Sequence, residues 1–125
     1  MLAELVLLPG EAEWIALVPR EGAPTLPEGI RAVTAPRAAR LANASGALTG
    51  RPRLDRAVGG ADVVWLPAPA PVGWSRDVPA VLTLHDISWE ERPRDFTPYE
   101  RAWHVACRPR RLASRASRVA CVSDS

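Results

Sequence analysis

Residues 81–86 read Val-Leu-Thr-Leu-His-Asp, an apolar run that ends on two polar side chains able to take part in chemistry. A second continuous apolar run, Val-Val-Trp-Leu, occupies residues 63–66. Strands that are apolar on both faces are typical of parallel sheets covered on both sides. Short buried helical segments share this pattern, but the shortness of the runs and the Pro or polar residues after them favour strands. We therefore predict that both runs are strands of a parallel sheet.

Five runs along the chain read as strands. They are Trp14–Val18, Arg31–Thr34, Asp62–Leu66, Ala80–Leu84 and Arg118–Val122. Two segments between them, Arg37–Leu48 and Arg53–Val58, have helical composition. The alternation predicts an α/β chain with a Rossmann-like parallel sheet. In such sheets ligands bind beyond the carboxyl ends of the strands, so Pro67–Trp74, His85–Trp89 and Ser123–Ser125 are the segments to examine.

The clearest helix start lies at Thr97. Its hydroxyl can cap the free backbone amides, Pro98 suits the first helical position, and Glu100 completes a capping box. Pro109 falls inside the continuation of this helix, which predicts a kink or two separate helices. Pro67, Pro69 and Pro71 exclude a regular helix between the two central strands, so a loop is expected there.

Length and composition limit the function classes. The 125 residues fit one domain, and the apolar stretches, about five to seven residues long, fall short of the roughly 20 needed to cross a bilayer. Met1–Leu8 lacks the features of a signal peptide, so Cys107 and Cys121 are interpreted as reduced thiols of a cytoplasmic protein. All 16 basic residues are Arg, but the net charge of +2 gives little support to nucleic-acid binding.

His85 and Asp86 directly follow a predicted buried strand, where side chains leave the core and face the ligand crevice. An imidazole there can donate to a phosphate or sugar oxygen, and its charge is adjustable near neutral pH. The structural alternative is a strand-end His satisfied by a backbone carbonyl, with Asp86 capping the next turn. The residues by themselves leave both interpretations open.

Four segments, in order and at the expected spacing, resemble motifs of the family 4 glycosyltransferases, a large retaining group with the GT-B fold. Residues 61–67, Ala-Asp-Val-Val-Trp-Leu-Pro, are similar to the family's DVVH-x-P strand and loop. Residues 78–89, which include His85-Asp86, look like its P-x-V-x-T-x-HD-x-S segment. Residues 93–116 are similar to the helical stretch that follows, and residues 117–125 match the A-x-x-V-x-x-VSE-x-S strand and turn.

The resemblance implies part of the acceptor-side, N-terminal domain of an enzyme that moves a sugar from a nucleotide diphosphate to a hydroxyl acceptor, either a sugar or a lipid-linked molecule. His85 then lies at the interdomain cleft beside the donor sugar and its phosphates. The resemblance makes His85 the candidate catalytic residue and Asp86 and Ser123 candidates for substrate binding. Asp86 matches the Asp that orders the loop, and Ser123 matches a Ser beside the cleft, where an ordinary helix cap is an equal alternative. Polysaccharide, envelope or glycolipid biosynthesis is the expected setting. Neither a metal nor another cofactor is expected.

The chain also departs from the family pattern. The opening strand with its glycine-rich turn and the donor-binding second domain are not recognisable, and Trp65 stands where many members have His. We therefore expect the 125 residues alone to be inactive. The alternative hypothesis is a non-catalytic, truncated α/β binding module.

Two further features have competing interpretations. The stretch Arg101–Arg118 is a candidate for peripheral contact with anionic lipid at the inner membrane face, or else a solvated helix face, which is the favoured interpretation. Among the tryptophans, Trp14 and Trp65 are predicted to be core. Trp74 and Trp89 lie in predicted strand-end loops and are the candidates for stacking on a sugar, with Trp89 assigned to substrate binding.

Overall fold

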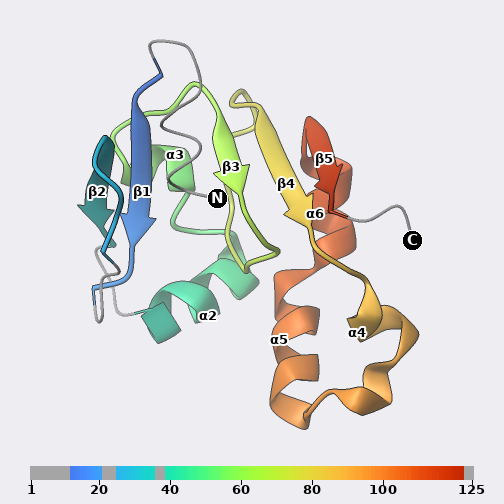
Figure 1. Ribbon diagram of the computed structural model, residues 1–125. Coiled ribbons are helices and arrows are strands. Elements are labelled where there is room, and N and C mark those ends of the chain that lie inside the picture. The colour runs from blue at the N-terminus through green and yellow to red at the C-terminus, as the bar shows by residue number, and fades with distance from the viewer. Residues whose placement is uncertain (1–11, 21–24, 36–38, 123–125) are drawn as a thin grey trace.

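The computed structural model describes residues 12–20, 25–35 and 39–122 and has a mixed α/β architecture in which every strand pair is parallel (Figure 1). Its strands are β1 (Trp14–Val18), β2 (Ile30–Thr34), β3 (Val64–Leu66), β4 (Ala80–Leu84) and β5 (Arg118–Cys121). All five predicted strands are confirmed, and the largest difference in a boundary is the two residues by which β3 begins after Asp62. In the described residues the strands form two sheets, β1-β2 and β3-β4-β5.

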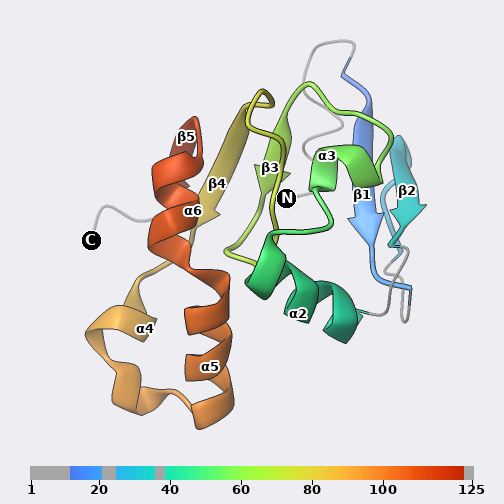
Figure 2. The same ribbon diagram turned by 180° about the vertical axis from the view of Figure 1, so that it is seen from behind.

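The helices occupy two regions, one on a face of the sheets and one beyond the carboxyl end of β4. They are α2 (Ala39–Thr49), α3 (Leu54–Ala57), α4 (Ser88–Glu91), α5 (Pro98–Cys107) and α6 (Pro109–Arg115), with a 3₁₀ turn, η1, at Pro93–Asp95. Figure 2 shows α2, α3 and α6 in front of the strands when the molecule is seen from behind. The sequence pattern predicted α2 and α3, whereas α4 and η1 were not predicted. None of the helices among the described residues is long and apolar enough to cross a membrane.

The predicted start and break of the long helical stretch are both confirmed. Thr97 accepts a hydrogen bond from the backbone N–H of Glu100, and the Glu100 carboxylate accepts one from the backbone N–H of Thr97 at 2.8 Å. Arg108 then adopts a left-handed backbone with φ of 48°, which separates α5 from α6. Few non-glycine residues adopt this conformation. The chain therefore ends one helix and starts another at Arg108, and α5 and α6 are not one bent helix.

The connection from β3 to β4 is a loop, as the prolines predicted, and its end is tied to the start of α3. Asp55 is buried and accepts hydrogen bonds from the backbone N–H of Ser75 at 2.8 Å and from its hydroxyl at 2.6 Å. The backbone N–H of Leu54 donates to the carbonyl of Gly73 at 2.9 Å. In a crossover helix the backbone groups would pair with one another. In this loop the bonds to Asp55 and Leu54 give the Ser75 N–H and the Gly73 carbonyl their partners instead.

The core lies between the β3-β4-β5 sheet and α6. Its buried members are Val64, Leu66, Trp74, Ala80, Leu82 and Leu112. Trp74 is only 4% exposed, so its interpretation as a loop residue open to a sugar is wrong. The physical reason is the tie between Asp55 and Ser75, which holds the neighbouring Trp74 against the sheet. Trp65 is half-buried rather than fully in the core, and its ring N–H donates to the Thr83 hydroxyl at 3.0 Å.

Replacing Asp55 by Asn should lower the free energy of unfolding by about 1–3 kcal/mol, because an amide cannot accept both hydrogen bonds from Ser75. Burial raises the pKa of Asp55, but the hydrogen bonds from Ser75 outweigh it and leave the pKa below its ordinary value. The contribution is therefore present at neutral pH and is lost as the pH falls through the lowered pKa. Urea denaturation at several pH values measures it. Asp62→Asn, at an exposed carboxylate, is the matched control, and equal midpoints for the two variants would contradict the role of Asp55.

The two cysteines should differ strongly in reactivity. Cys107 is 2% exposed and burial raises its pKa to about 11, whereas Cys121 is exposed at the end of β5. Since the thiolate is the nucleophile, a thiol reagent at pH 8 should modify Cys121 quickly and Cys107 only after unfolding. Intact-mass spectrometry with Cys121→Ser as the control separates the two sites. Rapid labelling of both thiols in the native protein would rule out the buried position of Cys107.

Candidate functional site

His85 lies at the carboxyl edge of the sheet, where β3 and β4 end side by side. Its Nε2 is 2.9 Å from the carbonyl oxygen of Pro67, the first residue after β3. The parallel pairing of β3 with β4 explains this proximity, because both strands deliver their carboxyl ends to one edge. The structure thus brings Pro67 and His85 together, each from a segment that directly follows a strand.

This contact restricts the chemistry that His85 can perform. A carbonyl oxygen only accepts, so Nε2 carries the hydrogen and Nδ1 is the nitrogen left for other partners. In the neutral ring Nδ1 is an acceptor, and it becomes a donor only when the ring is protonated. Donation to a phosphate or sugar oxygen, as expected from the sequence, therefore requires the imidazolium form of His85.

Asp86 forms a local turn. Its Oδ1 accepts a hydrogen bond from the backbone N–H of Ser88 at 2.9 Å and another from the Ser88 hydroxyl. These bonds hold the pKa of Asp86 below its usual range, the side-chain bond having the larger effect, so the carboxylate is ionised at neutral pH. The contacts of His85 and Asp86 are thus those of the structural interpretation, a carbonyl partner for the ring and a turn for the carboxylate. The catalytic and substrate-binding roles stay predictions.

Trp89 belongs to an aromatic cluster that joins α4 to α5. Its ring stacks on His104 with centroids 5.4 Å apart and planes inclined by 13°, and Phe96 meets His104 edge-on at 5.5 Å. Beside the cluster, Nε of Arg110 donates to Glu90 at 2.8 Å, which ties α6 to α4. The hydrogen bond from Arg110 lowers the pKa of Glu90 and keeps the pair ionised. One face of the Trp89 ring is consequently occupied by protein.

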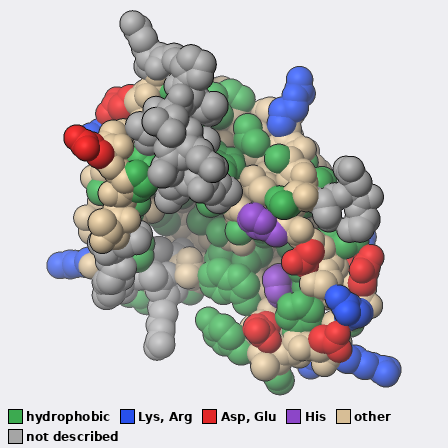
Figure 3. All heavy atoms as spheres, in the orientation of Figure 1, with side chains coloured by type: hydrophobic (Ala, Val, Ile, Leu, Met, Phe, Trp, Pro, Cys, Tyr) green, Lys and Arg blue, Asp and Glu red, His purple; other side chains and the backbone are tan. Residues whose placement is uncertain are grey.

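A cavity of about 560 Å³ lies beside this cluster, lined by residues that include Trp89, His104, Val105 and Pro109. His85 and Asp86 are not among the residues that line it. Figure 3 shows both histidines of the chain on one face, with acidic and hydrophobic side chains around them. Trp89 therefore contributes to this cavity, whereas His85 and Asp86 do not. Ser123, the remaining predicted site residue, lies outside the described residues.

Sequence reasoning missed His104, Phe96 and the pair of Glu90 with Arg110. Trp89 and His104 are 15 residues apart on separate helices, so no local spacing could have brought them together. The only usable signal was the capping box at Thr97, which fixes where α5 begins. Within the part of the chain that the structure describes, no group of three or more His, Cys, Asp or Glu side chains is arranged to hold a metal ion.

Comparisons of the chain with protein-family models, curated proteins and solved structures give no match.

The geometry of His85 makes a prediction that is independent of any activity. The neutral ring should carry its hydrogen on Nε2, because Nε2 donates to the Pro67 carbonyl. Long-range ¹H–¹⁵N correlation spectra at a pH well above neutrality distinguish the two tautomers, and His104→Gln assigns the signals. A dominant Nδ1–H tautomer at His85 would show that the contact with Pro67 is not formed.

Proposed function

We propose that this chain is part of the acceptor-side domain of a nucleotide-sugar-dependent, retaining glycosyltransferase with a GT-B fold. The enzyme transfers a sugar from a nucleotide diphosphate to a hydroxyl group of a sugar or lipid-linked acceptor. Two lines of support are the order of the strands and the position of the His85-Asp86 pair.

The order of the strands supports a Rossmann-like sheet. In the order 3-2-1-4-5-6, the first strand lies between the second and the fourth. Across Figure 1 the strands follow one another as β2, β1, β3, β4 and β5 and run in one direction, which matches positions three, two, four, five and six. The remaining position lies between β1 and β3, where none of the described residues forms a strand.

The single observation that carries the proposal is the pair His85-Asp86 at the carboxyl end of a central parallel strand. Three of the four segments that resemble the family contain β3, β4 and β5, adjacent strands of one sheet, and the fourth contains α5 and α6. Ligands of open α/β sheets bind beyond such ends, and His85 is exposed there. A donor phosphate or sugar hydroxyl in this crevice would meet the Nδ1 side of the ring.

In the proposed reaction the protein neutralises the departing diphosphate and holds the acceptor hydroxyl near the anomeric carbon, a form of electrostatic preorganisation. His85, fixed by Pro67 through Nε2, presents Nδ1 in one orientation. As a neutral ring it accepts a hydrogen bond from a sugar hydroxyl, and as imidazolium it donates to a phosphate oxygen. Asp86 holds the turn that follows and keeps the ring at the strand end.

A second candidate, a non-catalytic α/β binding module, is favoured by one specific observation. Within the described residues, both His85 and Asp86 already have the partners that a purely structural role requires. A module of this kind would keep the strand-end geometry and have no turnover.

The test uses the full-length protein encoded by the native gene, rather than the 125 residues alone, assayed with a panel of nucleoside diphosphate sugars and hydroxyl acceptors. We expect transfer with retained anomeric configuration, read by NMR of the product. His85→Ala should lower kcat roughly 100-fold or more without loss of folded structure. His85→Gln, which can still donate to the Pro67 carbonyl, is the matched control for the structural contact.

The two variants separate the candidates. If both variants have low activity, the imidazole ring of His85 itself takes part in the reaction. Near-normal activity of His85→Gln with low activity of His85→Ala assigns His85 a positioning role. Absence of transfer and of nucleotide-sugar hydrolysis by the wild-type protein would favour the binding module and reject the enzyme.

A further inference from the structure

A groove runs between α2 and α6, on the side of the sheet that these helices cover. Neither His85 nor Asp86 is among its lining residues. Figure 2 shows these two helices flanking the loop that joins β3 to β4. The groove encloses about 400 Å³, and Pro71, Val72, Gly73 and Trp74 of that loop contribute to its lining. Its volume is in the lower range of small-molecule sites.

The groove exists because the β3–β4 connection contains no helix. A crossover helix would normally fill the space between α2 and α6, but prolines forbid one and the loop packs flat instead. Two glycines allow the close contact: a Cβ at Gly46 would stand 1.7 Å from the Pro71 oxygen, and one at Gly73 would stand 2.3 Å from the Gly50 oxygen. The loop backbone therefore packs directly against the end of α2.

Six arginines line the groove, and we call it the arginine groove. They are Arg51, Arg53, Arg76, Arg108, Arg111 and Arg115. No Asp or Glu is among its lining residues. Three of the six follow one another along the start and one side of α6, and the other three come from the segments after α2 and after the loop. Arginines therefore contribute to both walls of the groove.

None of these six arginines forms an ion pair with a carboxylate among the described residues. The ion pairs there involve Arg31, Arg92 and Arg110 and none of the six. Asp55 is engaged by Ser75, and Asp77 lines a neighbouring cavity together with Arg76 and Arg115. An anion in the groove would relieve the mutual repulsion of these charges.

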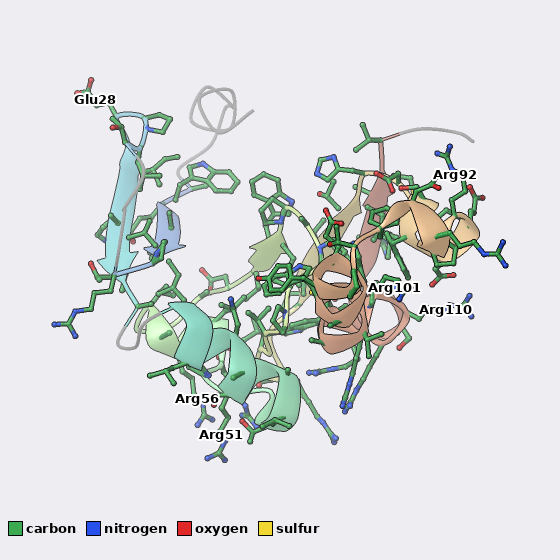
Figure 4. The ribbon with its side chains drawn as sticks, turned by 90° about the horizontal axis from the view of Figure 1, so that it is seen from below. Glu28, Arg51, Arg56, Arg92, Arg101 and Arg110 are labelled. Carbon is green, nitrogen blue, oxygen red and sulfur yellow. The ribbon has the colours of Figure 1, made fainter. Side chains whose placement is uncertain are left out.

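Arg115 is already oriented by the protein. Its guanidinium lies 4.6 Å from the centre of the Trp74 ring and donates to the Trp74 carbonyl at 3.3 Å. Arg53 is half-buried, whereas Arg51 is exposed at the rim and extends outward beyond α2 (Figure 4). The groove thus combines one oriented cation with further arginines that form no ion pair among the described residues, an arrangement suited to a ligand with several negative groups.

We propose that the arginine groove binds a small ligand that carries two or more phosphate groups. The guanidinium fork matches phosphate oxygens two at a time, and opposing walls of arginine require more than one phosphate. A flat bilayer cannot reach the floor of a groove, and the net charge of +2 is small for a binder of long nucleic acid. The proposal is independent of the glycosyltransferase proposal, because His85 and Asp86 are not in the lining.

The experiment titrates inorganic tripolyphosphate into the full chain by isothermal titration calorimetry at low salt, with pyrophosphate and orthophosphate as shorter probes. We expect saturable binding of tripolyphosphate, weaker binding of pyrophosphate and the weakest for orthophosphate. Arg53→Gln and Arg111→Gln should each lower the affinity for tripolyphosphate roughly tenfold, because each removes a charged donor from one wall. Arg101→Gln removes the same charge from an exposed position on α5 outside the groove and should keep the wild-type affinity.

Arg111 is exposed, so its variant tests the groove even if Arg53→Gln lowers the stability of the protein. The proposal is overturned if tripolyphosphate shows no saturable binding, or if all three variants bind it equally. Binding of phosphatidylglycerol vesicles or of a single-stranded oligonucleotide without binding of tripolyphosphate also overturns it, because the arginines would then serve a membrane or nucleic acid.

Discussion

The buried carboxylate of Asp55 is the constraint on which most of this structure depends. By accepting two hydrogen bonds from Ser75, it fixes the far end of a loop that has no helix of its own. The near end of the same loop is held by His85, whose Nε2 meets the carbonyl of Pro67. The prolines exclude regular structure from this connection, so these contacts hold it at both ends. Several of its backbone groups find hydrogen-bond partners without a helix.

This pinning decides which side chains are buried. Trp74, the residue before Ser75, packs in the core beside Leu66 and Leu82. Burial of its large aromatic ring is more favourable in free energy than exposure to solvent. The loop packs so closely against the end of α2 that Gly46 and Gly73 have no room for a Cβ. Because the loop packs flat where a crossover helix would stand, it leaves a space that the six arginines line.

The two proposed sites accordingly lie at different places on one scaffold. The His85 edge is formed by strand ends, and its side chains are oriented by local backbone contacts. The arginine groove is formed by helices and a loop, with Arg115 held over Trp74. Between them, the aromatic cluster of Trp89, Phe96 and His104 joins α4 to α5, and the pair of Glu90 with Arg110 fastens α4 to α6. The loop from Pro67 to Ser75 contributes to both sites, through the Pro67 carbonyl at His85 and through residues 71–74 in the lining of the groove.

Local signals in the sequence were enough to predict the five strands, the cap at Thr97, the break before Pro109 and the helix-free loop after β3. Each of these depends on a few adjacent residues, through continuous apolar runs, side-chain capping or the missing amide of proline. The position of His85 at a strand end followed from the same signals. Only the tertiary structure decided that Trp74 is core, that His104 covers Trp89, that Nε2 of His85 is occupied, and that six arginines share one groove. These features bring together residues far apart along the chain, and long-range packing is not encoded in local periodicity.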